Sequence, residues 1–309
     1  MHMTACDMCC GEAVYTRSYS GEHLCGSCYT ASIEKRVQHT ISRHKMLEPK
    51  DKVALALSGG KDSVSMLHIL CKLEKHFPMS SMVAVTVDEG IDDYRREAIE
   101  IAVENCRRQG VQHRVYSFKD IYGYTLDEVA EAARKIGKSF ICSYCGILRR
   151  KALNLAAKKL GATKLATAHN LDDEVQSTIM NFLRGDLASI RRGKSEAEEV
   201  DGLVPRVKPL CEVPEREVAL YAHFKGIRLQ SLCCGYLESS LRSDVRRFLN
   251  ELEEKHAGMK FSAYRSFEKV KPLLESQERR GVGLCSVCGE PAAGEICMAC
   301  QILGEFGLK

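Results

Sequence analysis

The sequence predicts an α/β fold in which a central domain with a parallel β-sheet is flanked by a small cysteine-rich module at each end. Two observations carry this prediction. Short apolar runs alternate with helical patterns through the middle of the chain, and paired cysteines gather at both termini. Alternating strands and helices are typical of a parallel sheet with helices on its faces. We expect the 309 residues to divide into 1–32, 33–270 and 271–309.

The first strand of the sheet is predicted at the apolar run 52–57, which stops at the glycine pair 59–60. A helix should follow, because Val64 and Cys71 belong to a set of apolar residues at helical spacing. The later elements are expected, in order, as a strand at 82–88, a helix at 94–109, a strand at 112–118, a helix at about 147–160, a strand at 165–169, a mobile loop at 186–202, and helices around 214–226 and 239–256. Ligands of such sheets bind beyond the carboxyl ends of the strands, which points to residues 58–63, 88–90 and 169–174.

Composition narrows the class of protein. No run of about 18 apolar residues is present, which excludes a membrane-spanning helix. The chain does not open with a secretory leader, so we expect a cytoplasmic protein. In that reducing compartment, 16 cysteines indicate metal binding or catalysis rather than disulfides. The net charge of +4 neither requires nor excludes a nucleic-acid partner.

Residues 58–63, Ser-Gly-Gly-Lys-Asp-Ser, predict a phosphate-binding loop. The two glycines let backbone N–H groups converge on an anion, and the start of the following helix adds a partial positive charge. Lys61 can neutralise phosphate charge, while Ser58 and Ser63 can donate hydrogen bonds. The spacing differs from that of a Walker A motif. The simpler alternative is a glycine turn before a helix that is capped by Asp62 or Ser63.

The central cysteines form a second candidate site. Cys142 and Cys145 are spaced as C-x-x-C, and the adjacent Cys233 and Cys234 follow about ninety residues later. Two thiolates cannot complete a zinc site, which needs four ligands. A third cysteine from the distant pair would leave one position open, and three cysteines suit a [4Fe-4S] cluster with one free iron. A redox pair and plain burial remain alternatives for the C-x-x-C cysteines.

Paired C-x-x-C motifs at both termini predict two zinc ribbons. The sets are Cys6, Cys9, Cys25 and Cys28 at the amino terminus, and Cys285, Cys288, Cys297 and Cys300 at the carboxyl terminus. Cys10 could replace Cys9 as a ligand. Modules of this size lack a core, so the metal supplies their folding free energy. A closed four-cysteine site has no open position, so we expect RNA docking or dimer contacts from these modules rather than chemistry.

The loop at 58–63 resembles the PP-loop of the ATP pyrophosphatase superfamily, whose domains are adenine nucleotide alpha hydrolase-like. Residues 87–91 resemble the segment of that family that approaches the adenosine. Residues 142–153, 169–174 and 181–186 further resemble the TtcA/TtuA/NcsA group of tRNA 2-thiolation enzymes, and most of all the NcsA branch, which acts on the wobble uridine. The resemblance covers nearly the whole chain. It implies cleavage of ATP between the α and β phosphates and adenylation of a substrate oxygen.

The resemblance also implies site residues. The nucleotide contacts would be Ala56, Ser58, Gly59, Gly60, Lys61, Asp62, Ser63, Asp88, Gly90, His169 and Asp172. Lys61 would stabilise phosphoryl charge and Asp173 would be the catalytic carboxylate. Asp172 and Asp173 could instead hold Mg²⁺ or simply begin a helix, where carboxylates are favourable. His169 could be no more than a residue at a strand end.

By the same resemblance, Cys142, Cys145 and one of Cys233 and Cys234 would hold a [4Fe-4S] cluster. Read without gaps, the family pattern favours Cys234, although a shifted loop would use Cys233. Arg149 stands near the position where some members carry a lysine. Because arginine keeps its charge, we expect it to hold phosphate rather than to donate a proton.

Three functions follow as hypotheses. The first is a tRNA-uridine 2-sulfurtransferase that uses ATP with Mg²⁺, an iron–sulfur cluster, two zinc ions and a sulfur donor that is sulfide or a carrier protein. Its target would be the wobble uridine or, alternatively, a T-loop uridine, and the family suggests a homodimer. The second drops the cluster, so that Cys145 or Cys234 carries a persulfide and the pair then closes as a disulfide. The third is a zinc-ribbon RNA-binding scaffold without catalysis.

Overall fold

The computed structural model describes residues 4–75, 79–192, 202–236, 240–274 and 282–308. Its centre is a five-stranded sheet in the order β5-β4-β3-β6-β7, and every neighbouring pair is parallel, as predicted. The strands are β3 (Lys52–Ala56), β4 (Ser81–Asp88), β5 (Gln112–Ser117), β6 (Lys164–Ala166) and β7 (Arg206–Val207). Because all five run the same way, their carboxyl ends share one edge of the sheet.

Both faces of the sheet are buried, and the alternation of side chains along β3 shows why. Val53 and Leu55 pack into the large core formed with α1 (Gly26–Arg43), α2 (Lys61–Glu74) and α9 (Glu215–Phe224). Ala54 faces the other way and packs against α6 (Ile141–Lys159). Successive residues of a strand point to opposite faces, so a nearly continuous apolar run is what a doubly covered strand requires.

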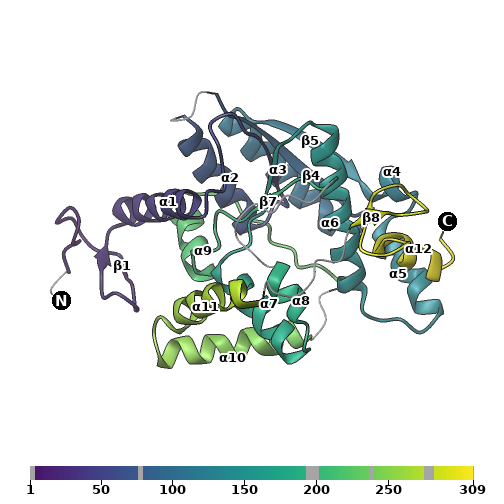
Figure 1. Ribbon diagram of the computed structural model, residues 1–309. Helices are drawn as coiled ribbons and strands as arrows, with labels where there is room; N and C mark the ends of the chain where they lie inside the picture. The colour runs from purple at the N-terminus through teal and green to yellow at the C-terminus, as the bar shows by residue number, and fades with distance from the viewer. Residues whose placement is uncertain (1–3, 76–78, 193–201, 237–239, 275–281, 309) are drawn as a thin grey trace.

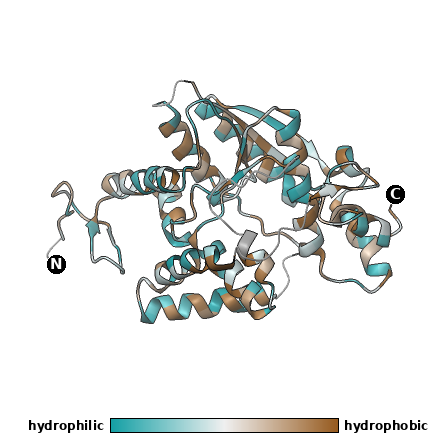
Figure 2. Ribbon diagram, viewed as in Figure 1, coloured by the Kyte–Doolittle hydropathy of each residue, from teal (hydrophilic) through white to brown (hydrophobic). Residues whose placement is uncertain are grey.

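Further helices extend this framework on the two sides (Figure 1). α3 (Tyr94–Gln109) packs on β4 and β5, and α4 (Phe118–Tyr122) and α5 (Leu126–Lys135) lie beside α6. α7 (Leu171–Leu183), α8 (Leu187–Arg192), α10 (Leu241–Lys255), α11 (Met259–Val270) and the short 3₁₀ turn η1 (Lys271–Leu274) form a second group. Figure 2 shows hydrophilic and hydrophobic residues alternating along α10, which buries Val245 and Leu249 against α7. Among the described residues, no helix is both long and apolar enough to cross a membrane.

The two cysteine-rich modules lie at opposite ends of the molecule (Figure 1). The hairpin of β1 (Tyr15–Thr16) and β2 (His23–Leu24) leads directly into α1, which runs on into the central domain across residue 32. The hairpin of β8 (Gly283–Leu284) and β9 (Pro291–Ala292) leads into α12 (Met298–Glu305), which packs on α6. Each module therefore repeats the same hairpin-plus-helix plan.

The boundaries of several elements differ from the prediction. α6 begins at Ile141 rather than near 147, so Cys142 and Cys145 lie in its first turns instead of in a preceding loop. Burial of the surrounding apolar residues outweighs the roughly 1 kcal/mol that Gly146 costs the helix. β6 ends at Ala166, three residues early, because the chain turns there so that Asn170 can cap α7.

Other segments were not anticipated. The loop expected at 186–202 contains α8, and residues 193–201 of it lie outside the described part of the chain. α5 and α11 were missed, although α5 begins with a capping box formed by Thr125 and Glu128. That box is a recognisable helix-start signal in the sequence. β7 has only two residues and no pattern that the sequence could reveal.

Candidate functional site

The loop between β3 and α2 is shaped by its own serines. The Ser63 hydroxyl donates to the carbonyl of Gly60 at 2.9 Å and accepts from the backbone N–H of Ser58 at 3.1 Å. Gly59 has φ of +87°, and a Cβ there would lie 2.2 Å from the carbonyl oxygen of Ala98 on α3. A side chain at this position is therefore excluded both by the backbone conformation and by the neighbouring helix.

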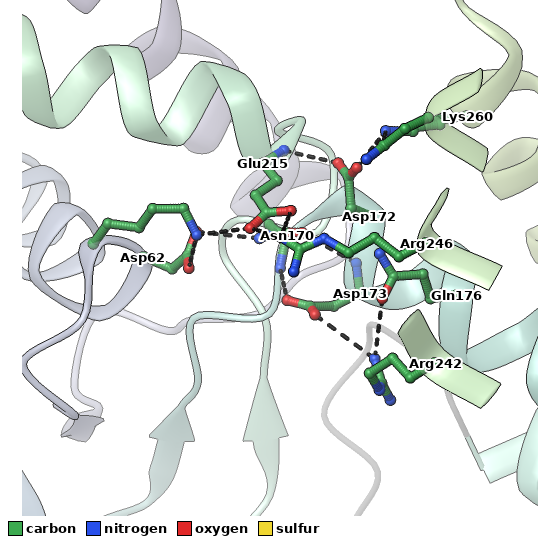
Figure 3. Close-up of polar contacts among 11 residues, drawn as sticks. Asp62, Asn170, Asp172, Asp173, Gln176, Glu215, Arg242, Arg246 and Lys260 are labelled. Carbon is green, nitrogen blue, oxygen red and sulfur yellow. Dashed lines mark hydrogen bonds and ion pairs between the residues drawn. The ribbon is translucent and has the colours of Figure 1, made fainter. Parts of the chain in front are cut away.

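Lys61 opens α2 and is held between two carboxylates. Its Nζ donates to Asp62 Oδ2 and to Glu215 Oε1, each at 2.8 Å. Burial alone would lower the pKa of Lys61, but the two carboxylates more than offset this and raise it. Arg246 of α10 forms an ion pair with the same Glu215. A cation on the loop and a cation on α10 thus meet at one carboxylate at the start of α9. Figure 3 shows Arg246 beside Glu215.

The start of α7 carries the next group of side chains (Figure 3). Asn170 caps the helix by accepting from the N–H of Asp173, and its Nδ2 donates to Asp62 Oδ1 at 3.1 Å. Asp172 is buried, where it pairs with Lys260 of α11 and accepts from the N–H of Glu215 at 2.8 Å. The two aspartates therefore have different surroundings. Asp172 contacts α11 and the start of α9, while Asp173 faces the phosphate loop.

Asp173 has a distinctive electrostatic environment. Its side chain is 35% exposed, and Arg242 approaches its Oδ1 at 3.8 Å. Crowding by protein atoms and, after that, the charge of Asp62 raise the pKa of Asp173 to about 6, against the effect of its hydrogen bond from Asn170. A carboxyl group that titrates near neutrality can accept a proton during a reaction.

An open cavity of about 350 Å³ lies over the carboxyl ends of β3, β4 and β6. Of the predicted nucleotide contacts, those that line it are Ala56, Ser58, Gly60, Asp62, Ser63 and His169. Gly59, Asp88 and Gly90 do not line this cavity. In the segment after β4, the residues that line it are Val87 and Glu89 instead. Asp88 instead accepts a hydrogen bond from Gly90 at 2.9 Å and shapes the turn. Lys61 and Asp172 line a neighbouring pocket of about 540 Å³ beside α9 and α11.

The opposite wall of this cavity is the first part of α6. Gly146, Arg149 and Arg150 line it, directly after the C-x-x-C cysteines. Arg149 contacts both a central cysteine and a residue of the cavity wall. Its Nη2 lies 3.6 Å from Cys145 Sγ, and its Nε lies 3.4 Å from Glu89 Oε1. Glu89 is buried and also pairs with Arg95 at 2.7 Å. The nucleotide-sized cavity and the central cysteines are therefore neighbours.

The central cysteines differ in their surroundings. Burial raises the pKa of Cys145 to about 11, an effect that Arg149 opposes and that Glu89, Cys234 and Cys142 reinforce. Cys234 is half-buried and packs against the core beside α6, whereas Cys233 is exposed. In the described part of the chain, these sulfur atoms are not gathered as tightly as the two terminal sets. Cys142 Sγ donates to the backbone carbonyl of Tyr236 at 2.7 Å, which brings the start of α6 to the segment that carries Cys234.

The terminal cysteines form two compact sets. The four sulfur atoms of each predicted set lie within 4.8 Å of one another. Cys9 and Cys25 are separated by 3.6 Å and Cys288 and Cys297 by 3.8 Å. Zn–S bonds of about 2.3 Å in a tetrahedron place sulfur atoms about 3.8 Å apart, so both sets fit such an ion. Cys10 is exposed and lies outside the amino-terminal set.

Several residues of the site were missed by sequence reasoning. They are Arg95, Glu215 and Lys260, all of them charged. Glu215 and Lys260 reach the site through long-range contacts with Lys61 and Asp172, whereas Arg95 pairs with the nearby Glu89. Glu215 stands next to Pro214 at the start of α9, a helix-start signal that could have drawn attention to it. The others had no local signal, because a charged residue on a helix normally faces solvent.

Comparison with known proteins supports the architecture. A family model for the PP-loop domain matches residues 29–252. The chain is 37% identical to the tRNA 2-thiolation protein NcsA of Haloferax volcanii over 96% of this chain and 98% of that protein. It is 35% identical to the cytoplasmic tRNA 2-thiolation protein 1 of Drosophila melanogaster, over 98% and 88% of the two chains.

A solved structure gives the same result. The U34-tRNA thiolase NcsA of Methanococcus maripaludis, determined with its [4Fe-4S] cluster, matches 99% of this chain and 97% of its own with a TM-score of 0.85 and 35% identity. The resemblance inferred from the sequence motifs is therefore confirmed over the full length. The chain belongs to the PP-loop family and, within it, to the group of tRNA 2-thiolation proteins.

Proposed function

We propose that this protein is an ATP-dependent tRNA uridine 2-sulfurtransferase that acts on the wobble uridine. One observation carries the proposal: the cavity of about 350 Å³ is lined on one side by the phosphate loop and on the other by α6 directly after Cys145. Activation by ATP and delivery of sulfur can then take place within one cleft. The names of the Haloferax, Drosophila and Methanococcus relatives agree with this activity.

ATP with Mg²⁺ would bind with its phosphates on the loop at 58–63 and at the start of α2. The backbone N–H groups there, together with Lys61, provide the positive charge that the phosphates need. Lys61 and Arg246 are held by Glu215 in this structure, so binding of phosphate would release them from that carboxylate. His169 lines the cavity, and the protein atoms crowded around its ring, together with nearby cations, lower the pKa of His169 to about 4, so its ring would contact the nucleotide as a neutral group.

The chemistry requires two substitutions. The uridine O2 attacks the α-phosphorus of ATP, and pyrophosphate leaves. Sulfide sulfur then attacks C2, and AMP departs with the former O2, so no net oxidation or reduction occurs. Asp173 would take up the proton that is lost as sulfur replaces oxygen, consistent with its pKa of about 6. Arg149 lies between the two half-sites and would hold the α-phosphate in place.

Cys142, Cys145 and Cys234 would hold a [4Fe-4S] cluster. Cys234 is favoured over Cys233 because it is half-buried beside Cys145, whereas Cys233 is exposed. A cluster held by three cysteines leaves one iron without a protein ligand, and that open position supplies a site for incoming sulfur. The two terminal four-cysteine sets would each hold zinc. Sulfide or a carrier protein as donor, a homodimer and a cytoplasmic location complete the proposal.

Replacing Lys61 tests the activation step. Lys61→Ala should lower tRNA-dependent formation of AMP from ATP about a hundredfold or more, because the phosphate charge loses its lysine. Lys72→Ala is the matched control, since Lys72 is an exposed lysine of the same helix and its buried partner Glu34 keeps Lys225 as a second cation. An unchanged rate of AMP formation in Lys61→Ala protein would contradict the proposal, and no tRNA-dependent AMP from the wild type would favour the scaffold hypothesis.

Metal analysis distinguishes the cluster from the persulfide alternative. Protein purified without oxygen should contain about four iron and four sulfide per chain and about two zinc ions. Cys142→Ala should remove the iron and spare the zinc. Iron-free protein that still thiolates tRNA would instead make Cys145 and Cys234 sulfur carriers.

A further inference from the structure

A second, larger cavity shares a wall with the nucleotide cavity. It measures about 700 Å³ and lies between α6, residues 203–208 and the carboxy-terminal module. Arg150, Thr167, His169 and Arg206 line both cavities. The proposed reaction must bring a second substrate to the bound nucleotide, and this second cavity opens at the right place.

The shared wall carries positive charge without a matching carboxylate. In the described part of the chain, neither Arg150 nor Arg206 has a carboxylate within ion-pair distance. Arg206 Nη2 donates to the backbone carbonyl of Arg150 at 2.8 Å, which brings the two residues together. Crowding by protein atoms, and the charge of neighbouring arginines, lower the pKa of both. Such a pair is stabilised by an anion that binds between the two guanidinium groups.

The other charges around the second cavity are already neutralised. Lys208 pairs with Glu174 at 2.8 Å, and the carboxylate of Glu290 pairs with Lys158 at 3.0 Å. Lys151 donates to the sulfur atoms of Cys288 and Cys297 in the carboxy-terminal module. The arginine pair is therefore the feature of this wall that calls for an anionic ligand.

The remaining lining is apolar and partly open. Leu203 and Met298 line the cavity and are 41% and 56% exposed. Ile147 and Ile296 complete this apolar surface. A ligand that offers a flat, weakly polar face next to a single negative charge matches the lining, and a nucleotide within an RNA strand has both.

The carboxy-terminal module forms the roof of the second cavity, and several contacts hold the module in place. The Lys151 and Lys158 contacts join the module to α6. Gly202 lies so close to the module that a Cβ there would be 2.5 Å from Pro291 Cγ. The second cavity is thus a built feature of the interface between the module and the central domain.

We propose that the second cavity binds the RNA nucleotide adjacent to the target uridine, and that Arg150 and Arg206 hold the phosphodiester that joins the two. This proposal rests on the proposed function, because it assigns a subsite to the same RNA substrate. It also gives the carboxy-terminal module a specific role, because the module forms the roof over the flanking base.

Two variants test the subsite by direct binding of unmodified tRNA. Met298→Glu places a negative charge in the roof without touching the nucleotide cavity, and it should weaken tRNA binding about tenfold while ATP binding is unchanged. Met259→Glu is the matched control, because Met259 is an exposed methionine on α11. Arg206→Gln should weaken tRNA binding and reduce the slope of log K against log salt by about 0.9, the value for one lost phosphate contact with duplex, or about 0.7 with a single strand. Lys135→Gln, on the exposed surface of α5, should leave the slope unchanged.

A crosslinking experiment tests the same point in the wild-type protein. A tRNA with 4-thiouridine immediately beside the target uridine should crosslink to peptides that contain residues 203–208 or 290–301. Crosslinks elsewhere, or variants that bind tRNA like the wild type in a protein that does thiolate tRNA, would overturn this proposal alone. If Arg206→Gln impairs ATP binding but not tRNA binding, the pair serves the nucleotide instead. A wild-type protein that fails to thiolate tRNA would overturn the proposed function first, and this subsite with it.

Discussion

At the scale of single residues, Asp173 should set the lower pH limit of activity. Its carboxyl group has a pKa raised to about 6, chiefly by burial, and the proposed step needs the ionised form. The rate constant kcat/KM for tRNA thiolation should therefore fall about tenfold per pH unit below pH 6. Asp173→Asn should lose most of the activity and this acidic limb together. An unshifted acidic limb in the variant would assign the titration to another group.

The raised pKa of Asp173 also makes the stability of the folded protein depend on pH. Because the folded protein holds this proton more tightly than the unfolded chain, ionisation of Asp173 reduces stability as the pH rises from about 4 through 6. Asp173→Asn removes that cost, and its amide oxygen can still accept from the N–H of Asn170. The midpoint of thermal unfolding at pH 7 should therefore not fall in the variant, which separates lost chemistry from lost structure.

Gly59 and Gly60 adjoin in the phosphate loop but should respond differently to alanine. Gly59 has φ of +87° and no room for a Cβ. Gly60 has φ of −76°, and a Cβ added there would lie 3.5 Å from its nearest neighbour, the Ser58 hydroxyl oxygen. Gly59→Ala should destabilise the fold by at least about 1–3 kcal/mol, the usual cost of a strained backbone conformation. Gly60→Ala should cost less than about 1 kcal/mol. Equal losses in denaturant unfolding would contradict this account of the loop.

At the scale of elements, α6 links the carboxy-terminal module to the rest of the site. Lys151 Nζ lies 3.0, 3.4 and 3.6 Å from the sulfur atoms of Cys288, Cys297 and Cys300. A zinc ion with four thiolates carries a net charge of −2, so this ammonium group stabilises the bound form. Lys151→Met should release one zinc to a chromogenic chelator about tenfold faster or more. Lys135→Met, which removes an exposed lysine of α5, is the control. Identical release rates would show that the lysine does not support the metal.

At the scale of the whole molecule, one buried carboxylate joins the amino-terminal module to the central domain. Glu217 of α9 is 2% exposed and pairs with Arg17 at 3.0 Å and Arg36 at 2.9 Å. Glu217→Gln removes the buried carboxylate that both arginines share, which leaves Arg17 with only the exposed Glu22, and should lower the free energy of unfolding by about 3–5 kcal/mol. Glu22 also pairs with Arg17 at 2.9 Å but is 47% exposed. Glu22→Gln should therefore cost less than about 1 kcal/mol, and equal effects would mean that the buried contact does not hold the module.

The sequence by itself determined the parallel sheet, the phosphate loop and the two four-cysteine sets. Each is encoded locally, by the nearly continuous apolar runs at 52–57 and 82–88, by the glycine pair before α2, or by the spacing of cysteines. Such signals survive in a single sequence because strand burial, a tight turn and a metal site restrict the residues at fixed intervals. The start of α6 was misplaced because the helical pattern around Gly146 is carried by distant packing.

Only the tertiary structure decided how the charged groups are distributed. Lys61 meets Glu215 across 154 positions and Asp172 meets Lys260 across 88. The arginine pair likewise joins α6 to β7. The local sequence around a lysine, arginine or glutamate on a helix does not show whether the side chain faces water or a buried partner. The folded chain alone supplies the partner, and with it the low-dielectric surroundings that turn an ordinary charge into part of a site.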